Sequence, residues 1–306
     1  MASVGEALVR ERDLVFDFGF HRGEDTGYYL AMGQRVVAVD ASAELIAAGR
    51  ERFAAALASG QLTLVHAALI GSAQRADTTA LLFYPHPQRS EWGSVDLRWV
   101  RRNAEAHGLP HAEPVHVPAV CLQELVQRYG CPQFLKIDIE GADAAVLADL
   151  ALLPVRPEYV SWETGKESLQ GVLQQHRQLH RLGYGRFRVV QQAYLEHQPP
   201  AIAANGEPWQ LEPGCSGLMP ARSGQPWRSL AWVCWQYRLL FVAYRLVGPR
   251  SWFRAAARRR SRWIGGLPRR LQRWAHSHQV PLPGWVDSHA RLTLSGDSVP
   301  RRPPCS

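Results

Sequence analysis

The chain has 306 residues, which suits one large domain or one domain with a smaller module. Hydrophobic residues make up 46% of it, enough for a full core. Its five cysteines form no CxxC pair, and residues 1–12 carry charges in place of an apolar run. We therefore expect neither a disulfide framework nor a signal peptide, and predict a reduced, cytoplasmic protein.

The net charge of +8 is unevenly distributed along the chain. Residues 245–306 carry 13 Arg against Asp287 and Asp297, a net charge of +11. Residues 1–244 carry 22 basic and 25 acidic residues, a net charge of −3. The basic character therefore belongs to the C-terminal segment and gives no information about what the rest of the chain binds.

Strand and helix signals alternate through the first 200 residues, which is typical of βαβ units. Ser42 is the expected N-cap of the second helix. The pattern predicts a mostly parallel sheet with helices on both faces. In chain order we predict strand 14–18, helix 24–32, strand 35–39, helix 42–57, strand 62–65, helix 122–129, strand 134–139, helix 143–150, strand 159–162, helix 168–182 and strand 187–190.

The last hundred residues are organised differently. Residues 198–227 are rich in Pro and Gly and predict a loop. Residues 229–247 are apolar but too short and too charged for a membrane span, so we predict a packed helix, with an interfacial helix as the alternative. We divide the chain into a core at 1–200, a loop and helix packed on it at 201–247, and an Arg-, Trp- and Pro-rich basic tail at 248–306.

The first predicted strand runs into a glycine loop, FDFGFHRGED. Gly19 and Gly23 suit a tight turn with close backbone approach to a ligand. The dinucleotide fingerprint would also need glycine at the positions of His21 and Glu24. Glu24 and Asp25 would repel a phosphate at the start of the following helix. The loop therefore favours a ligand without phosphates, such as S-adenosylmethionine with its cationic sulfonium.

Acidic residues stand at the ends of the first two strands, where parallel sheets bind ligands. Asp17 ends the first strand, and Asp40 ends the second, 21 residues after Gly19. A carboxylate at Asp40 can accept both hydroxyl protons of a ribose. The alternative is that Asp40 caps the helix that begins at Ser42.

The segment FLKIDIEGAD places Lys136, Asp138 and Glu140 on one face of a predicted strand. Charges are normally excluded from the central strand of a parallel sheet, and burying three is costly unless they pair or face a ligand. Lys136 is one of only two lysines beside 33 Arg, which hints at a position that requires a compact ammonium. Glu163 ends the next strand. A purely structural pair of Lys136 and Asp138 is the alternative.

Together these segments resemble the FkbM-type family of S-adenosylmethionine-dependent methyltransferases, and KIDIEG is the most specific piece. The resemblance is carried by FDFGFHRGEDTGYYLAMGQRVVAVDA (16–41), SEWGSVDLRW (90–99), VPAVCLQELVQRYGCPQFLKIDIEGAD (117–143), PEYVSWET (157–164) and GWVDSHARL (284–292). It implies a class I methyltransferase fold, an α/β Rossmann-like, mostly parallel seven-stranded sheet whose last strand runs antiparallel. It implies O-methyl transfer to a hydroxyl of a sugar, glycan or other secondary metabolite.

The resemblance also implies roles for residues. S-adenosylmethionine is the expected cofactor, and the expected cofactor-binding residues are Asp17, Gly19, Gly23, Asp40 and Ala41. The acid at Asp40 is commonly Glu in the family, so we expect ribose binding with a shorter reach. The catalytic candidates are Lys136, Asp138, Glu140 and Glu163. The three acids are candidates for acceptor binding or general base, and Lys136 for stabilising the alkoxide or holding Asp138.

Rival interpretations concern metals and the basic tail. His176 and His180 lie one helical turn apart without HExxH context, which favours a solvated helix face. Spacing gives no support for Mg²⁺ at Asp138 and Glu140, so we expect no metal. The alternative function is a methyltransferase-like protein whose tail binds nucleic acid or a membrane surface. We expect a small-molecule or glycan acceptor and no nucleic acid, and leave open peripheral membrane contact through 229–263. No motif indicates the oligomeric state or the acceptor.

Overall fold

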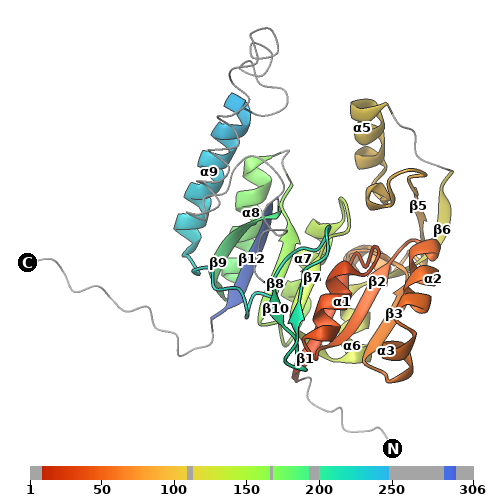
Figure 1. The fold of residues 1–306 in the computed structure, drawn as a ribbon. Coiled ribbons are helices and arrows are strands. Elements are labelled where there is room, and N and C mark those ends of the chain that lie inside the picture. Colours follow the sequence, from red (N-terminus) through yellow and green to blue (C-terminus); the bar gives the residue numbers. More distant parts are fainter. Residues whose placement is uncertain (1–8, 109–112, 166–167, 193–199, 248–285, 294–306) are drawn as a thin grey trace, which may run out of the picture.

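The computed structural model describes residues 9–108, 113–165, 168–192, 200–247 and 286–293. Its centre is a twisted seven-stranded sheet (Figure 1). In spatial order the strands are β3 Leu62–His66, β2 Arg35–Asp40, β1 Arg10–Phe18, β7 Cys131–Ile137, β8 Tyr159–Glu163, β12 Val286–Leu292 and β9 Tyr184–Gln191. Only β12 is antiparallel to its neighbours. The predicted mostly parallel seven-stranded sheet with an antiparallel last strand is confirmed.

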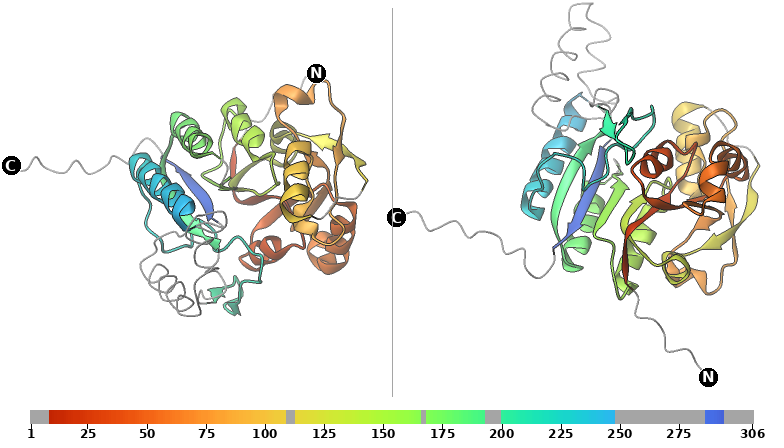
Figure 2. Two further views of the ribbon diagram at one scale, coloured as in Figure 1. Left: turned by 90° about the horizontal axis from the view of Figure 1, so that it is seen from above. Right: turned by 60° about the horizontal axis from the view of Figure 1, so that its bottom comes forward.

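Helices cover both faces of the sheet, as predicted, because side chains alternate between the two faces along each strand (Figure 2). Phe16, Leu135 and Val160 belong to one core and their neighbours Val15, Phe134 and Tyr159 to the other. The first core packs on α6 Leu122–Tyr129, α7 Asp143–Asp149, α8 Leu169–Arg181 and α9 Leu230–Val247. The second packs on α1 Glu24–Ala31, α2 Ala43–Arg52, α3 Ala54–Ala58 and residues 200–227, which include β10 Ala201–Ile202 and β11 Pro208–Trp209.

The second predicted helix is divided in two. The predicted cap is present, since the Ser42 hydroxyl accepts a hydrogen bond from Leu45 N at 3.3 Å. At Phe53 the backbone leaves helical geometry, with φ −112° and ψ 29°, and α3 begins after it. The Phe53 ring meets the Phe20 ring edge-on with centroids 6.1 Å apart. Tertiary packing of one aromatic side chain therefore interrupts a run that is helical by propensity.

A second, three-stranded sheet lies beside the main one, in a region where we predicted only loops. It consists of β4 Ala68–Leu69, β5 Ala80–Phe83 and β6 Val115–Val120, and the same region holds α4 Ser72–Arg75, a 3-10 turn Ser90–Trp92 and α5 Leu97–His107. β4 and β5 are two and four residues long, and Pro118 interrupts the pattern of β6. Such short strands form only through pairing with distant segments, so local pattern does not reveal them.

The seventh strand comes from the C-terminal segment. β12 pairs with β8 and β9 and is inserted between them. Val286 and Ala290 face the first core, while Asp287 and His289 are buried on the opposite face. Polar residues between the apolar ones hide the strand pattern of β12. The boundary that we placed at residue 248 therefore puts β12 in the tail, whereas in the structure β12 belongs to the central sheet. The remaining residues assigned to the tail lie outside the described part of the chain.

Helix α9 forms the outer layer beside α8 and β9, as the predicted packed helix. Val233, Cys234, Tyr237 and Leu240 are its buried residues. Among the described residues, no helix has the length and apolar character that a bilayer crossing requires.

Gly19 allows β1 and β7 to end against each other. It has φ +86°, and a Cβ added there would lie 1.8 Å from the carbonyl oxygen of Asp138. Even a small side chain would therefore separate the two strand ends that carry Asp17 and Lys136.

We predict that Gly19→Ala lowers the free energy of unfolding by more than about 3 kcal/mol, because the added methyl overlaps backbone that cannot rotate away. Gly60→Ala is the matched control, since Gly60 also has positive φ, +75°, but nothing lies within 4 Å. It should lose only about 1 kcal/mol from backbone strain. Equal losses in urea unfolding would show that the contact with Asp138 is unimportant.

Candidate active site

A cavity of about 680 Å³ opens at the edge where the parallel strands end. Its walls come from the loops after β1, β2 and β7, from residues 212–216 and from β12. A volume of this size is typical of a small-molecule site, and the carboxyl edge of a parallel sheet is the usual place for one.

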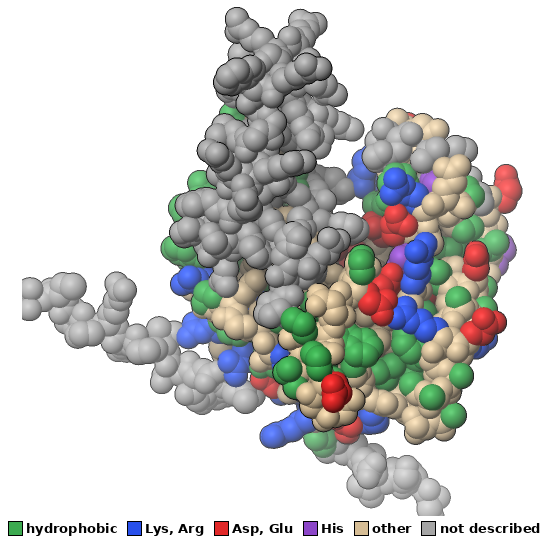
Figure 3. Space-filling model, viewed as in Figure 1, with side chains coloured by type: hydrophobic (Ala, Val, Ile, Leu, Met, Phe, Trp, Pro, Cys, Tyr) green, Lys and Arg blue, Asp and Glu red, His purple; other side chains and the backbone are tan. Residues whose placement is uncertain are grey.

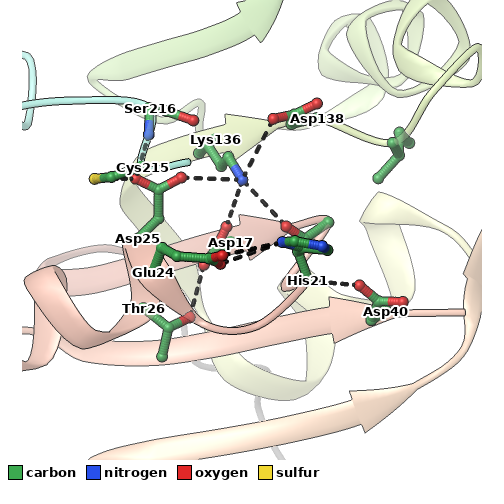
Figure 4. A network of polar contacts seen from close by, with 12 residues as sticks. Asp17, His21, Glu24, Asp25, Thr26, Asp40, Lys136, Asp138, Cys215 and Ser216 are labelled. Atoms are coloured by element: carbon green, nitrogen blue, oxygen red, sulfur yellow. Dashed lines mark hydrogen bonds and ion pairs between the residues drawn. The ribbon is translucent and has the colours of Figure 1, made fainter. Parts of the chain in front are cut away.

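The Lys136 ammonium lies at the base of this cavity and joins several elements (Figure 4). Its Nζ is 3.1 Å from the carbonyl oxygen of Gly19, to which it donates a hydrogen bond. Carboxylate oxygens of Asp17 and Asp25 lie 3.2 Å and 3.3 Å from the same atom, and one of Asp138 lies 3.8 Å away. The ammonium therefore hydrogen-bonds the Gly19 carbonyl and pairs closely with Asp17 of β1 and Asp25 of α1, with Asp138 at longer range.

Further hydrogen bonds hold the two inner carboxylates in place. The Thr26 hydroxyl donates to Asp17 at 2.6 Å. Asp25 accepts from the backbone N–H of Ser216 and from the Cys215 thiol, both at 2.8 Å. The network thereby ties β1, α1 and β7 to the loop at 213–216. No sequence motif indicates the contact with Cys215.

Burial and charge oppose each other in this network. Burial alone would lower the pKa of Lys136, but the carboxylates of Asp17, Asp25 and Asp138 raise that pKa well above its usual range. Burial raises the pKa of Asp17 to about 6, with Lys136 opposing the rise. Burial also raises the pKa of Asp138, against the same opposition. The lysine is therefore charged at neutral pH, and its charge keeps the surrounding carboxylates from being neutralised.

Asp40 bonds the residue that caps α2 and also lines the cavity. One carboxylate oxygen accepts the backbone N–H of His21 and the other that of Ser42, both at 2.8 Å. Asp40 and Ala41 also line the cavity. A carboxylate has about four lone-pair sites, so two remain for a ligand hydroxyl. Asp40 thus fixes the glycine loop and still faces the cavity.

The other residues predicted to touch the cofactor differ in position. Gly19 lines the cavity, but Asp17 is fully buried beneath Lys136. Gly23 begins α1 in the left-handed conformation, and a Cβ there would meet the rings of Phe53 and Phe20. Asp17 and Gly23 therefore support the loop from behind, outside the cavity wall.

The three remaining acids converge on the edge of the sheet. Carboxylate oxygens of Asp138, Glu140 and Glu163 lie within 4.8 Å of one another. β7 ends at Ile137, so Asp138 and Glu140 lie in the turn after it, and the predicted shared strand face does not extend to them. Glu140 has φ +45°, which turns the chain towards α7. Such a group could hold a divalent cation, although exposed acids commonly cluster without one.

The sequence analysis missed a fourth acid, Asp287. It is buried, lines the cavity from β12, and is the register partner of Glu163. Gln192 donates a hydrogen bond to it. Burial and the charges of Asp138 and Glu163 raise the pKa of Asp287 well above its usual range. An acid within the segment GWVDSHARL was the available signal, but its place beside Glu163 depends on sheet order.

The predicted solvated helix face at His176 is wrong. His176 is fully buried, with one ring nitrogen 2.8 Å from the Val172 carbonyl oxygen and the other 3.0 Å from the Ser288 hydroxyl. Burial lowers its pKa to about 4, so the ring is neutral. His180 is exposed, as expected. His176 anchors β12 to α8 and lies in the core opposite the cavity.

Comparison with known families decides what kind of site this is. Residues 17–185, more than half of the chain, match the model of the methyltransferase FkbM domain. The chain belongs to the FkbM methyltransferase family. The glycine loop, Asp40, Lys136 with its three carboxylates, and Glu163 of this FkbM methyltransferase fall within the matched residues. Cys215, Ser216 and Asp287 fall outside them.

Three solved structures are similar to parts of the chain, each at 14% identity. The C-terminal domain of precorrin-6Y C5,15-methyltransferase from Rhodobacter capsulatus has a TM-score of 0.33, over 60% of this chain and 69% of that one. Methyltransferase FkbM from Methylobacillus flagellatus KT has a TM-score of 0.31, over 52% of this chain and 35% of that one. An O-methyltransferase from Bacillus cereus in complex with SAH has a TM-score of 0.30, over 64% of this chain and 70% of that one. No curated protein matches the chain.

We predict that Lys136→Met lowers the free energy of unfolding by about 3–5 kcal/mol at neutral pH, because Asp17 and Asp25 lose their buried counter-ion. The pKa of Asp17 in the folded protein, about 6, lies above its unfolded value, so its ionisation costs stability as the pH rises. The defect should therefore shrink as the pH is lowered towards about 5.

Adding Asp17→Asn to Lys136→Met removes one of the unpaired charges and should restore part of the stability at neutral pH. Urea unfolding across pH measures both effects. A loss in Lys136→Met that does not change with pH, and that Asp17→Asn does not relieve, would show that the ion pairs are not its cause.

Proposed function

We propose that this FkbM methyltransferase transfers a methyl group from S-adenosylmethionine to a hydroxyl of a sugar, glycan or other secondary metabolite. The observation that carries the proposal is the cavity, which has Asp40 on one side and the acids Asp138, Glu140 and Asp287 on the other. Such a division suits a nucleoside on one side and a proton-releasing acceptor on the other.

The residues on the first side fit S-adenosylmethionine. Asp40 offers free lone pairs to ribose hydroxyls, and the apolar side chains of Ala67, Leu69 and Phe83 offer a surface for the adenine ring. Glu24 and Asp25 also line the cavity and suit the positive charges of the sulfonium and ammonium groups. No phosphate has to be accommodated, in keeping with acids at the start of α1.

On the second side we assign Asp138 as the general base. When bound, S-adenosylmethionine supplies the methyl group, and the protein contributes alignment of the acceptor and removal of its proton. Asp138 lines the cavity with its side chain 32% exposed, so an acceptor hydroxyl can reach it. The raised pKa of Asp138 lies closer to the working pH, which favours proton transfer. The Lys136 ammonium, 3.8 Å away, favours the ionised form that a base requires.

Lys136 then acts as a positioning residue. Its ammonium hydrogen-bonds Gly19 and pairs with Asp17 and Asp25, which favours the role of holding Asp138 over that of stabilising an alkoxide. The raised pKa of Asp287 favours its neutral form, which can donate a hydrogen bond to the acceptor. We propose the cytoplasm as the compartment, because the described cysteines Cys121, Cys131, Cys215 and Cys234 are all free.

We predict that Asp40→Ala weakens S-adenosylmethionine binding by about 100-fold, from the loss of hydrogen bonds to a charged acceptor. Titration calorimetry measures the Kd directly. Asp40→Glu, the acid common in the family, is the control and should retain most of the affinity. Unchanged affinity in Asp40→Ala would remove Asp40 from the cofactor site, and no binding by the native chain would contradict the proposed function.

We predict that Asp138→Asn lowers kcat by about 100- to 10,000-fold, the usual contribution of a general base. The Kd for S-adenosylmethionine should change little. Because the base must be ionised, kcat of the native chain should fall as the pH drops below the raised pKa of Asp138, and the variant should lose this dependence. Glu140→Gln, which also alters a cavity acid, should have the smaller effect.

Mass spectrometry of hydroxylated metabolites incubated with the chain and S-adenosylmethionine provides the assay, since the product gains one methylene in mass. Loss of activity on chelation, restored by Mg²⁺, would contradict the assignment of Asp138 as base. It would instead make Asp138, Glu140 and Glu163 metal ligands.

A further inference from the structure

Helix α9 has two apolar faces, and the described residues of the chain cover only one of them. Val233, Tyr237 and Leu240 face the core. Five large apolar side chains lie on the opposite face and are between 44% and 53% exposed: Trp232, Trp235, Leu239, Val242 and Leu246. Their spacing of three and four residues aligns them in one stripe along the helix. We call these five residues the outer stripe.

The outer stripe is continuous, because the rings of Trp232 and Trp235 contact each other with centroids 5.1 Å apart. Figure 3 shows hydrophobic side chains along the left edge of the molecule over α9, with basic ones beside them. Single exposed apolar residues are ordinary, but a stripe over four turns of helix marks an interaction surface.

The charge around the stripe identifies its partner. Residues 213–286 contain 13 Arg and neither Asp nor Glu, although the chain has 27 acids. Of these arginines, Arg238 and Arg245 are exposed on α9 beside the stripe, and the Arg228 guanidinium lies over the Trp232 ring at 5.2 Å. The stripe is therefore an apolar surface bordered only by positive charge, which complements a negatively charged partner.

This charge pattern disfavours three other occupants. A second copy would set Arg238 and Arg245 of two α9 helices together with no acid to balance them. The chain's own residues 248–285 contain no acid either. Nucleic acid would use the arginines and tryptophans, but Leu239, Val242 and Leu246 offer no ring for bases to stack on.

We propose that the outer stripe of α9 docks on an anionic lipid surface. Trp, Leu and Val side chains enter the boundary between headgroups and acyl chains, and Trp is enriched at that depth. The arginines beside the stripe then face anionic headgroups, each contributing about 1 kcal/mol. The proposal is independent of the reaction catalysed.

The test is cosedimentation of the purified full chain with phosphatidylcholine vesicles, with and without phosphatidylglycerol. The native chain should bind the anionic vesicles, and binding should weaken with salt. The triple variant Trp235→Gln, Leu239→Gln, Val242→Gln should bind at least about 100-fold more weakly, from the loss of half-exposed apolar groups. The variant Arg238→Gln, Arg245→Gln should bind about 30-fold more weakly.

A matched control separates the stripe from general surface polarity. Val115→Gln, Leu152→Gln, Ile202→Gln changes apolar residues of the same exposure, 48–58%, elsewhere on the surface, and should bind as the native chain does. Three results would overturn the proposal. They are native vesicle affinity in the α9 triple variant, preference of the chain for polyuridylate over vesicles, and a dimer of the native chain that the α9 triple variant alone dissociates. If the native chain does not bind vesicles, and the α9 triple variant alone has a lower melting temperature, the outer stripe instead packs against another part of the same chain and the proposal is overturned.

Discussion

The structure depends on one buried ammonium. Lys136 lies within 3.3 Å of both Asp17 and Asp25 and donates to the carbonyl oxygen of Gly19, with almost no exposure to solvent. Each of these charges alone would be costly to bury, and together they are stable only while all are present. Because they come from β1, α1 and β7, the ion pairs fix the relative positions of the elements that form the cavity floor.

This constraint explains why the cavity has two unlike sides. The Lys136 charge balances Asp17 and Asp25, so the glycine loop can pass directly over them. Gly19 of this loop and Asp40 at the end of β2 line the cavity. On the other side lie the acids of the turn after β7, of β8 and of β12. Burial raises the pKa of Asp138 and Asp287, and neighbouring carboxylates add to the rise. The same arrangement therefore gives the cavity one side whose buried acids are paired with Lys136 and one side with acids of raised pKa, the two sides on which the proposed function depends.

The seventh strand links this site to the outer surface. β12 brings Asp287 into the cavity and is anchored on its other face through Ser288, which contacts His176 and Tyr237. Tyr237 belongs to α9, whose far side carries the outer stripe. In the sequence, the Arg-rich residues 248–285 follow α9 and precede β12.

The sequence by itself determined the strands whose apolar runs are local, the cap at Ser42, and the acids at the ends of β2 and β8. It could do so because strand alternation and helix capping depend on residues a few positions apart. Only the tertiary structure decided that Lys136 faces Asp25, that Asp287 joins Glu163, and that β4 to β6 form a sheet. These features arise from pairing between distant segments, and their residues carry no local pattern that distinguishes them.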